Sequence, residues 1–357
     1  MRNKENVQEL LQYLQSKSQA NLTFDEDAIV KDYEKKEDNQ SLAIKILSVL
    51  GGLLASIAFI AFLFVSNLFD SKTAMLIFGG ICIAGALFLN RISDKIITDT
   101  LSVSSYLIGF VLVGISLVDQ EASKSVICII FLVIAVLALF IVDNYMMSFV
   151  SLLIINGSIL ALITLNEWHF LINLYTAIIA IVLTFIFLTE AKFMMQKNRI
   201  SQLYEPLRSA LVFTFLGLLI YISKFGIVEL SPVFKIIVSL VILFAILYIV
   251  SILFSILKIT NIKHKIMIAV ATVLLLAPTI YSPAISGTIL IILLSFLVNY
   301  RTGFALGIIG FIYSISMYYY DLHFTLLTKS IILFSSGILF LMIYLFTHKK
   351  LMSNEKV

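Results

Sequence analysis

The stretch SKSVICIIFLVIAVLALFIV, residues 123–142, decides the fold of this chain. It carries no charged residue after Lys124, and about 20 apolar residues at a rise of 1.5 Å each suffice to cross roughly 30 Å of hydrocarbon as a helix. The whole chain has the same character, with 61% hydrophobic residues, 13% charged residues and a mean hydropathy of +1.06. This composition is typical of an integral membrane protein and not of a set of soluble domains.

Similar apolar runs follow one another from Ile44 almost to the end of the chain. We therefore expect an all-α integral membrane protein, a polytopic bundle of about 12 transmembrane helices within residues 42–348, followed by a cytoplasmic tail at 349–357. The tight turns Asp143-Asn144 and Arg301-Thr302 leave ten or eleven spans open, because each could lie within one re-entrant or tilted element. The expected spans are 44–66, 73–90, 100–118, 123–142, 145–165, 168–188, 207–223, 232–258, 264–281, 284–300, 303–320 and 328–347.

Residues 1–41 differ from the rest of the chain, since they hold nine of its 21 acidic residues. Thr23 and Glu26 form a capping box that predicts the start of a second helix after a first, amphipathic one. We expect a short cytoplasmic helical hairpin here, either solvated beside the membrane or docking a separately encoded protein partner. The apolar face of the first helix is formed by Val7, Leu10, Leu11 and Leu14.

The distribution of Lys and Arg predicts the orientation of the spans. Cytoplasmic loops retain positive charge, and with a cytoplasmic N-terminus 20 of the 25 basic residues fall on the inner side. Both termini are then cytoplasmic, and the longest internal loop, Thr189–Pro206, divides the spans six and six. The basic residues lie in short loops between apolar runs, so they predict topology and no nucleic-acid partner.

Small residues spaced one helical turn apart predict where helices pack closely in lipid. For the glycines of the eleventh span, the alternative is a hinge or a gate. The predicted packing residues are Gly52 with Ser56, Gly80 with Ala84, and Gly303 with Gly307 and Gly310.

No pattern of residues predicts an enzyme. The four histidines are scattered along the chain, and no zinc-protease helix motif, nucleophile elbow, phosphate-binding glycine loop or paired-cysteine motif occurs. We expect no catalytic residue, no metal and no cofactor, and membrane lipids as the general partner. Asn156, near the middle of the fifth span, either forms an interhelical hydrogen bond or, with Gly157, breaks the helix and exposes its backbone to a ligand.

The polar and aromatic segment YYYDLHFTLLTKS, Tyr318–Ser330, interrupts the last apolar runs. Lys329 begins the last span, and the positive end of that helix favours an anionic group there. The alternative is an aromatic belt with a lysine anchor at the outer interface. The candidate ligand or structural site comprises Tyr319, Tyr320, Asp321, His323, Lys329 and Ser330, with Asn156 as a further, deeper position.

This segment also carries a resemblance to a known family. Its continuation YYYDLHFTLLTKSIILFSSGILFLM, together with LSVLGGLLASIAFIAFLFVSNLF in the first span, resembles bacterial multi-pass membrane proteins of the domain of unknown function 4401 group and, more distantly, the 2157 group. Asn67-Leu68 stands where the 2157 group has Asn-Trp, which favours the 4401 group. The resemblance implies a topology in a bacterial inner membrane and transfers no mechanism.

Two functions remain after these exclusions. The first is a permease-like or lipid-handling protein whose ligand enters near Tyr319, Asp321 and Lys329. The second is a non-catalytic membrane scaffold or envelope-stress component that acts with a partner bound to residues 1–41. A polar cavity between the helices would favour the first function, and a packed core with a bound partner would favour the second.

Overall fold

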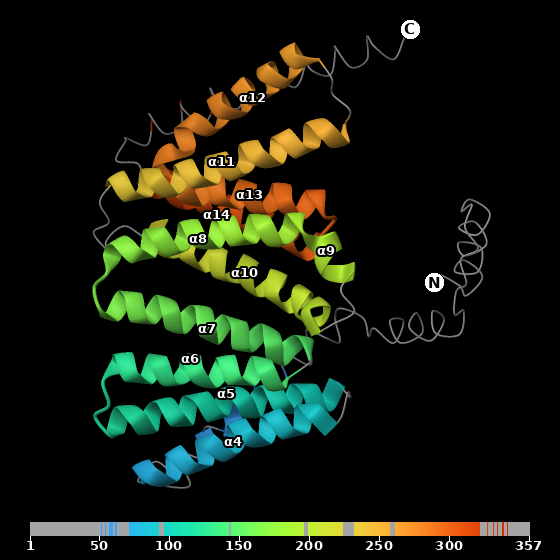
Figure 1. Cartoon of the computed structure of the whole chain (residues 1–357). Helices are drawn as coiled ribbons and strands as arrows, with labels where there is room; N and C mark the ends of the chain where they lie inside the picture. Colours follow the sequence, from blue (N-terminus) through green and yellow to red (C-terminus); the bar gives the residue numbers. More distant parts are fainter. Residues whose placement is uncertain are drawn as a thin grey trace, which may run out of the picture. The chain divides into compact units, whose positions relative to one another are not determined.

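The computed structural model describes residues 71–92, 96–142, 144–195, 199–223, 232–257 and 261–321, with isolated positions between 51 and 62 and between 327 and 341. Within these residues the chain is all-helical (Figure 1). Nine of the described helices are long and apolar enough to cross a membrane, when α12 is counted together with the 3-10 turn that continues it to Tyr281. The helices are α4 (Lys72–Ile92), α5 (Ile96–Asp119), α6 (Lys124–Ile141), α7 (Tyr145–Leu165), α8 (His169–Leu188), α9 (Glu190–Met195), α10 (Arg199–Ser223), α11 (Pro232–Ile256), α12 (Ile262–Leu276), α13 (Pro283–Leu297) and α14 (Arg301–Asp321), with a 3-10 turn, η2 (Ala277–Tyr281), after α12.

The expected count of about 12 spans is met only in part. The described residues contain the nine long helices and α13, whose 15 residues correspond to the predicted span 284–300. At 1.5 Å per residue α13 is about 22 Å long, which is shorter than the hydrocarbon layer. The predicted spans 44–66 and 328–347 lie largely outside the described residues, and the hairpin at 1–41 and the tail at 349–357 lie wholly outside them.

Three helices end in the same left-handed cap, formed without glycine. Glu121, Glu167 and Asn299 have φ angles of 62°, 57° and 56°. After α13 the Tyr300 N–H donates to the Ser295 carbonyl at 2.8 Å, the 6→1 bond that defines this cap. The caps after α7 and α13 reverse the chain within a few residues, so that α8 and α14 run opposite to the helices that precede them (Figure 1).

Each of the two tight turns of the sequence lies where a new helix starts. Asp143-Asn144 lies between α6 and α7, and the Asn144 side chain accepts a hydrogen bond from the Met146 N–H at 2.8 Å. Arg301-Thr302 forms the first turn of α14, after the cap at Asn299. An Asn at the N-cap position satisfies a backbone donor that the helix itself leaves free.

The prediction of a loop over Thr189–Pro206 is wrong for the described part of that segment. Residues 190–195 form α9, and α10 starts at Arg199 and continues through Pro206. The rings of Phe193 and Tyr204 stack at 5.9 Å between centroids. This contact between the two helices gives the polar segment tertiary support that its sequence does not reveal.

The chain divides into two compact units on either side of Ser116, and each is described by itself. In the first, α4 and the main part of α5 meet at two glycines. A Cβ on Gly109 would lie 2.8 Å from the Gly79 carbonyl oxygen, and one on Gly79 would lie 2.9 Å from Val113. The predicted seam at Gly80 and Ala84 is therefore displaced by one residue, because the Gly79 side of α4 faces α5 and Gly80 is exposed.

The core of the second unit lies among α8, α10, α11 and α13, which pack against one another (Figure 1). The apolar side chains of this core are packed together, and the same helices also bury polar residues, among them Thr184, Ser239 and Thr288. α14 joins this core through α13 and α10. The largest members of the core are Phe187, Tyr204, Phe215, Leu183, Leu218 and Leu219.

Candidate functional site

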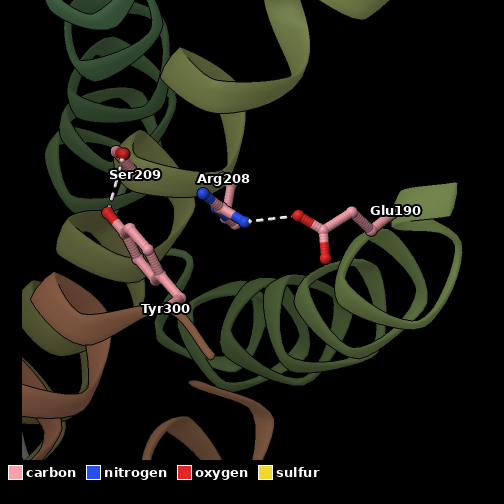
Figure 2. A network of polar contacts seen from close by, with 4 residues as sticks. All are labelled: Glu190, Arg208, Ser209 and Tyr300. Atoms are coloured by element: carbon pink, nitrogen blue, oxygen red, sulfur yellow. Dashed lines mark hydrogen bonds and ion pairs between the residues drawn. The ribbon is translucent and has the colours of Figure 1, made fainter. Parts of the chain in front are cut away.

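Arg208 is the one charged residue that is buried in the part of the chain described by the structure, with 8% of its surface exposed. It lies on α10, and its Nη1 atom is 2.8 Å from Oε1 of Glu190, the first residue of α9. The Glu190 side chain is 25% exposed and the Arg208 side chain 10% exposed, so the carboxylate is the outward partner of the pair. Figure 2 shows Arg208 pointing toward Glu190.

Three aromatic rings surround the guanidinium group. Its Cζ atom lies 4.1 Å from the ring centroid of Tyr300, 5.1 Å from that of Tyr204 and 6.0 Å from that of Phe187. An arginine over an aromatic face is attracted to the ring quadrupole, and the attraction is stronger where water is excluded. The rings therefore stabilise the buried charge together with Glu190.

A chain of hydroxyl groups connects the surroundings of Arg208 to α7. The Tyr145 hydroxyl donates to Ser209 Oγ at 2.9 Å. Figure 2 shows the second hydrogen bond of Ser209 Oγ, which joins it to the Tyr300 hydroxyl at 2.9 Å. We call the whole group the Arg208 cluster; it comprises Tyr145, Phe187, Glu190, Tyr204, Arg208, Ser209 and Tyr300.

Local structure explains how these residues come together. Tyr145 is the first residue of α7, directly after the Asn144 cap. Tyr300 follows the left-handed cap at Asn299, and its ring lies against Gly303, where any Cβ would overlap the ring. Glycine at position 303 is thus required by this close approach. The cluster joins the start of α7, the end of α8, α9, the first half of α10 and the turn before α14.

Two donors in the cluster have no hydrogen-bond partner within the described residues. They are the Nε–H of Arg208 and the hydroxyl of Tyr204, a residue that is 1% exposed. Leaving a buried donor unsatisfied costs about 1–3 kcal/mol. The cluster therefore contains binding capacity that its own side chains do not use.

The predicted outer site lies at the other end of α14. Tyr319 and Tyr320 form an edge-to-face pair with ring centroids 6.0 Å apart, and Tyr320 is 77% exposed. Asp321 is the last residue of α14, and its side chain is outside the described set, as are His323, Lys329 and Ser330. Between Tyr300 and Tyr319 the helix rises by about 28 Å, so the outer site and the Arg208 cluster lie at opposite ends of α14.

Asn156 forms a hydrogen bond between two helices. Its Oδ1 atom accepts from the Tyr175 hydroxyl of α8 at 2.5 Å, and its Nδ2 atom donates to the Leu152 carbonyl at 2.8 Å. α7 continues unbroken through Asn156 and Gly157. The alternative in which this pair interrupts the helix is therefore wrong.

The glycines of the eleventh span face their neighbours closely. A Cβ on Gly307 would lie 2.8 Å from Ile292 of α13, and one on Gly310 would lie 2.8 Å from Leu216 of α10. Together with Gly303 they allow α14 to approach the rest of the unit. Gly52 and Ser56 lie outside the described residues.

Sequence reasoning did not identify the Arg208 cluster. By the predicted bounds Glu190 lies in the loop Thr189–Pro206, Arg208 lies just inside the span 207–223, and Tyr145 and Tyr300 lie at the ends of their spans. The available signal was an arginine just inside a predicted span. Among the described residues, no group of three or more His, Cys, Asp or Glu side chains is arranged to hold a metal ion.

Comparison with known families gives one match, which covers most of the chain. The family described as "Domain of unknown function (DUF4401)" matches residues 41–350. The chain belongs to the DUF4401 family. No curated protein and no solved structure matches it. The match includes every residue of the Arg208 cluster, and membership in DUF4401 assigns no molecular function.

Proposed function

We propose that this DUF4401 protein is a permease-like or lipid-handling protein of the bacterial inner membrane, with both termini in the cytoplasm. The positive-inside rule supports the orientation. The hydrogen bonds from Tyr145 to Ser209 and between Ser209 and Tyr300 support the alternation of helices between α7 and α14, because they join the starts of α7 and α14 to the first half of α10. With this orientation the Arg208 cluster is at the cytoplasmic end.

The observation that carries the proposal is the ion pair between the buried Arg208 and the partly exposed Glu190, at a place where α8, α9 and α10 meet. A buried ion pair gives little net stability compared with apolar side chains of similar volume. Charged residues within membrane spans commonly mark ligand or ion pathways. We assign the cluster to an inner gate, in which breakable polar contacts hold the ends of α7, α8, α10 and α14 together.

The outer aromatic segment is the proposed second opening. Tyr319 and Tyr320 end α14 about 28 Å from Tyr300, and Asp321 and Lys329 add charges of both signs. A permease needs access from both faces of the membrane. The two sites on one helix are consistent with such a path.

A scaffold that binds a partner through residues 1–41 is the second candidate. The apolar core formed by Leu183, Phe215, Leu218 and Leu294 favours it, since tight packing suits a static protein. In this case the Arg208 cluster is a structural clamp.

Reconstitution into proteoliposomes distinguishes the two. Scrambling is measured as the loss of protection of a fluorescent phospholipid against dithionite, and flux as the release of trapped phosphate. The proposal is supported if the wild-type protein gives scrambling or phosphate release above that of protein-free vesicles, and if this activity is reduced in Arg208→Lys and retained in Lys263→Gln. No activity in either assay, with a second polypeptide that co-purifies only when residues 1–41 are present, supports the scaffold.

A further inference from the structure

We propose that the Arg208 cluster is a binding site for a phosphate group, which takes the place of Glu190 beside the guanidinium group. The inference names the ligand class of the proposed inner gate, and its physiological meaning rests on that function. Binding itself is measurable without any transport.

The first argument is the set of unused donors. A guanidinium group has five N–H donors in a rigid plane. The hydrogen bond between Arg208 and Glu190 uses only one of them, on Nη1. The Nε–H of Arg208 and the Tyr204 hydroxyl are both buried without a partner in the described structure. The Nε–H can only donate, and the Tyr204 hydroxyl, whose ring lies beside Arg208, can donate as well as accept, so an acceptor such as an anionic oxygen satisfies both groups.

The second argument is the direction of approach. Tyr204 and Arg208 are four residues apart on α10 and therefore lie on the same face of the helix. The rings of Tyr300 and Tyr204 lie within 4.1 and 5.1 Å of the guanidinium carbon, which leaves its edge for hydrogen bonding. The edge of an arginine matches phosphate and carboxylate oxygens with two parallel hydrogen bonds.

The third argument is charge. Arg208 and Glu190 together are neutral, so a bound anion would add an uncompensated charge to a buried place. Glu190 is the more exposed partner and begins the six-residue helix α9. The anion therefore displaces Glu190 toward solvent, and phosphate is favoured because its several oxygens can accept from the guanidinium N–H groups and from a neighbouring hydroxyl at the same time.

A phosphate group can belong to a lipid head group or to a soluble anion. The cluster lies at helix ends, where head groups meet the protein, so both sources reach it by the same chemistry. The test separates them by presenting each source alone to the full-length protein.

The experiment measures the unfolding temperature of the purified protein in a neutral detergent. Inorganic phosphate is titrated at constant ionic strength, and phosphatidylglycerol is added separately in mixed micelles. A ligand that binds the folded state raises the unfolding temperature in a saturable manner. A rise with phosphate alone assigns the site to a soluble anion, and a rise with phosphatidylglycerol alone assigns it to a lipid head group.

Four variants test the location of the site. Tyr204→Phe removes one hydroxyl and should weaken apparent binding roughly tenfold. Arg208→Lys keeps the charge, loses the fork and should weaken it at least as much. Glu190→Gln removes the competing carboxylate and should tighten it, whereas Lys263→Gln removes an exposed cation on α12 and should leave it unchanged.

Two results would overturn the inference. One is the lack of a saturable rise with either probe. The other is equal binding by the wild type, Tyr204→Phe and Arg208→Lys. Binding that follows the expected order in a protein without flux or scrambling keeps the phosphate site and removes the proposed transport function, so the two failures are distinguishable.

Discussion

The guanidinium carbon of Arg208 lies 4.1 Å from the ring centroid of Tyr300, although 92 positions separate the two residues in the chain. The same tyrosine is hydrogen-bonded to Ser209, the neighbour of the arginine. Tyr300 therefore touches α10 through both its ring and its hydroxyl. Because the tyrosine precedes α14 directly, these contacts fix where α14 begins against α10.

Tyr300→Leu should lower the free energy of unfolding by about 2–3 kcal/mol. It removes a cation–π contact worth about 2 kcal/mol in a desolvated place and a hydrogen bond worth about 1 kcal/mol. Tyr300→Phe keeps the ring and should cost about 1 kcal/mol. Unfolding in mixed micelles, followed by circular dichroism, measures both. Equal losses for the two variants would contradict a role for the ring.

The Arg208–Glu190 pair should behave as a unit. Glu190→Leu leaves the buried arginine without its counter-ion and should cost about 3 kcal/mol, whereas replacement of both residues, Arg208→Met with Glu190→Leu, should recover most of that loss. The same micelle unfolding experiment completes the double-mutant cycle. If the losses of unfolding free energy in Arg208→Met and Glu190→Leu simply add up in the double variant, the two side chains do not interact.

Gly109→Ala should separate α4 from α5. A Cβ there would lie 2.8 Å from the Gly79 carbonyl oxygen, a backbone atom that moves only with its helix. Overpacking of this kind costs about 1–3 kcal/mol. Gly80→Ala is the matched control, because its Cβ meets nothing within 4 Å and alanine favours the helix. Equal stability of the two variants would contradict the contact between α4 and α5.

Tyr175→Phe should lower stability by about 0.5–1 kcal/mol, the usual size of an interhelical hydrogen bond in a membrane. It deletes the hydroxyl that donates to Asn156. Proteoliposome activity should not change, since the bond joins two continuous helices. A loss of activity with normal stability would instead make Asn156 part of a ligand path.

Lys329→Ala tests the outer site proposed from the sequence. The variant should insert and fold normally and lose the flux or scrambling of the wild type, because the charge near the start of the last span is removed. Yield and unfolding temperature serve as the folding measures. Full activity at normal yield would remove Lys329 from the proposed ligand path.

The helices of the described region could be predicted because apolar length is a local property of the sequence. The run at 123–142 becomes α6 without reference to any other residue. Helix packing is different, since one residue turns a helix face by about 100°. This is why Gly80 was predicted at a contact that Gly79 makes.

The Arg208 cluster could not be predicted for a related reason. Tyr145, Glu190, Arg208 and Tyr300 are far apart in the sequence. They meet only because particular parts of different helices are neighbours in space. Uniformly apolar runs do not specify which ends adjoin. The polar segment around Pro206 also had the composition of a loop, whereas contacts between α9 and α10 hold it as helix.

The most direct test of the central claim is a high-resolution electron cryomicroscopy structure of the wild-type protein in native lipid, with attention to the Nε atom of Arg208 and the Tyr204 hydroxyl. The account predicts a phosphate-shaped density in contact with both donors and the Glu190 side chain turned toward solvent. An intact Arg208–Glu190 pair with both donors bonded to protein carbonyl groups would contradict it and make the cluster a structural clamp.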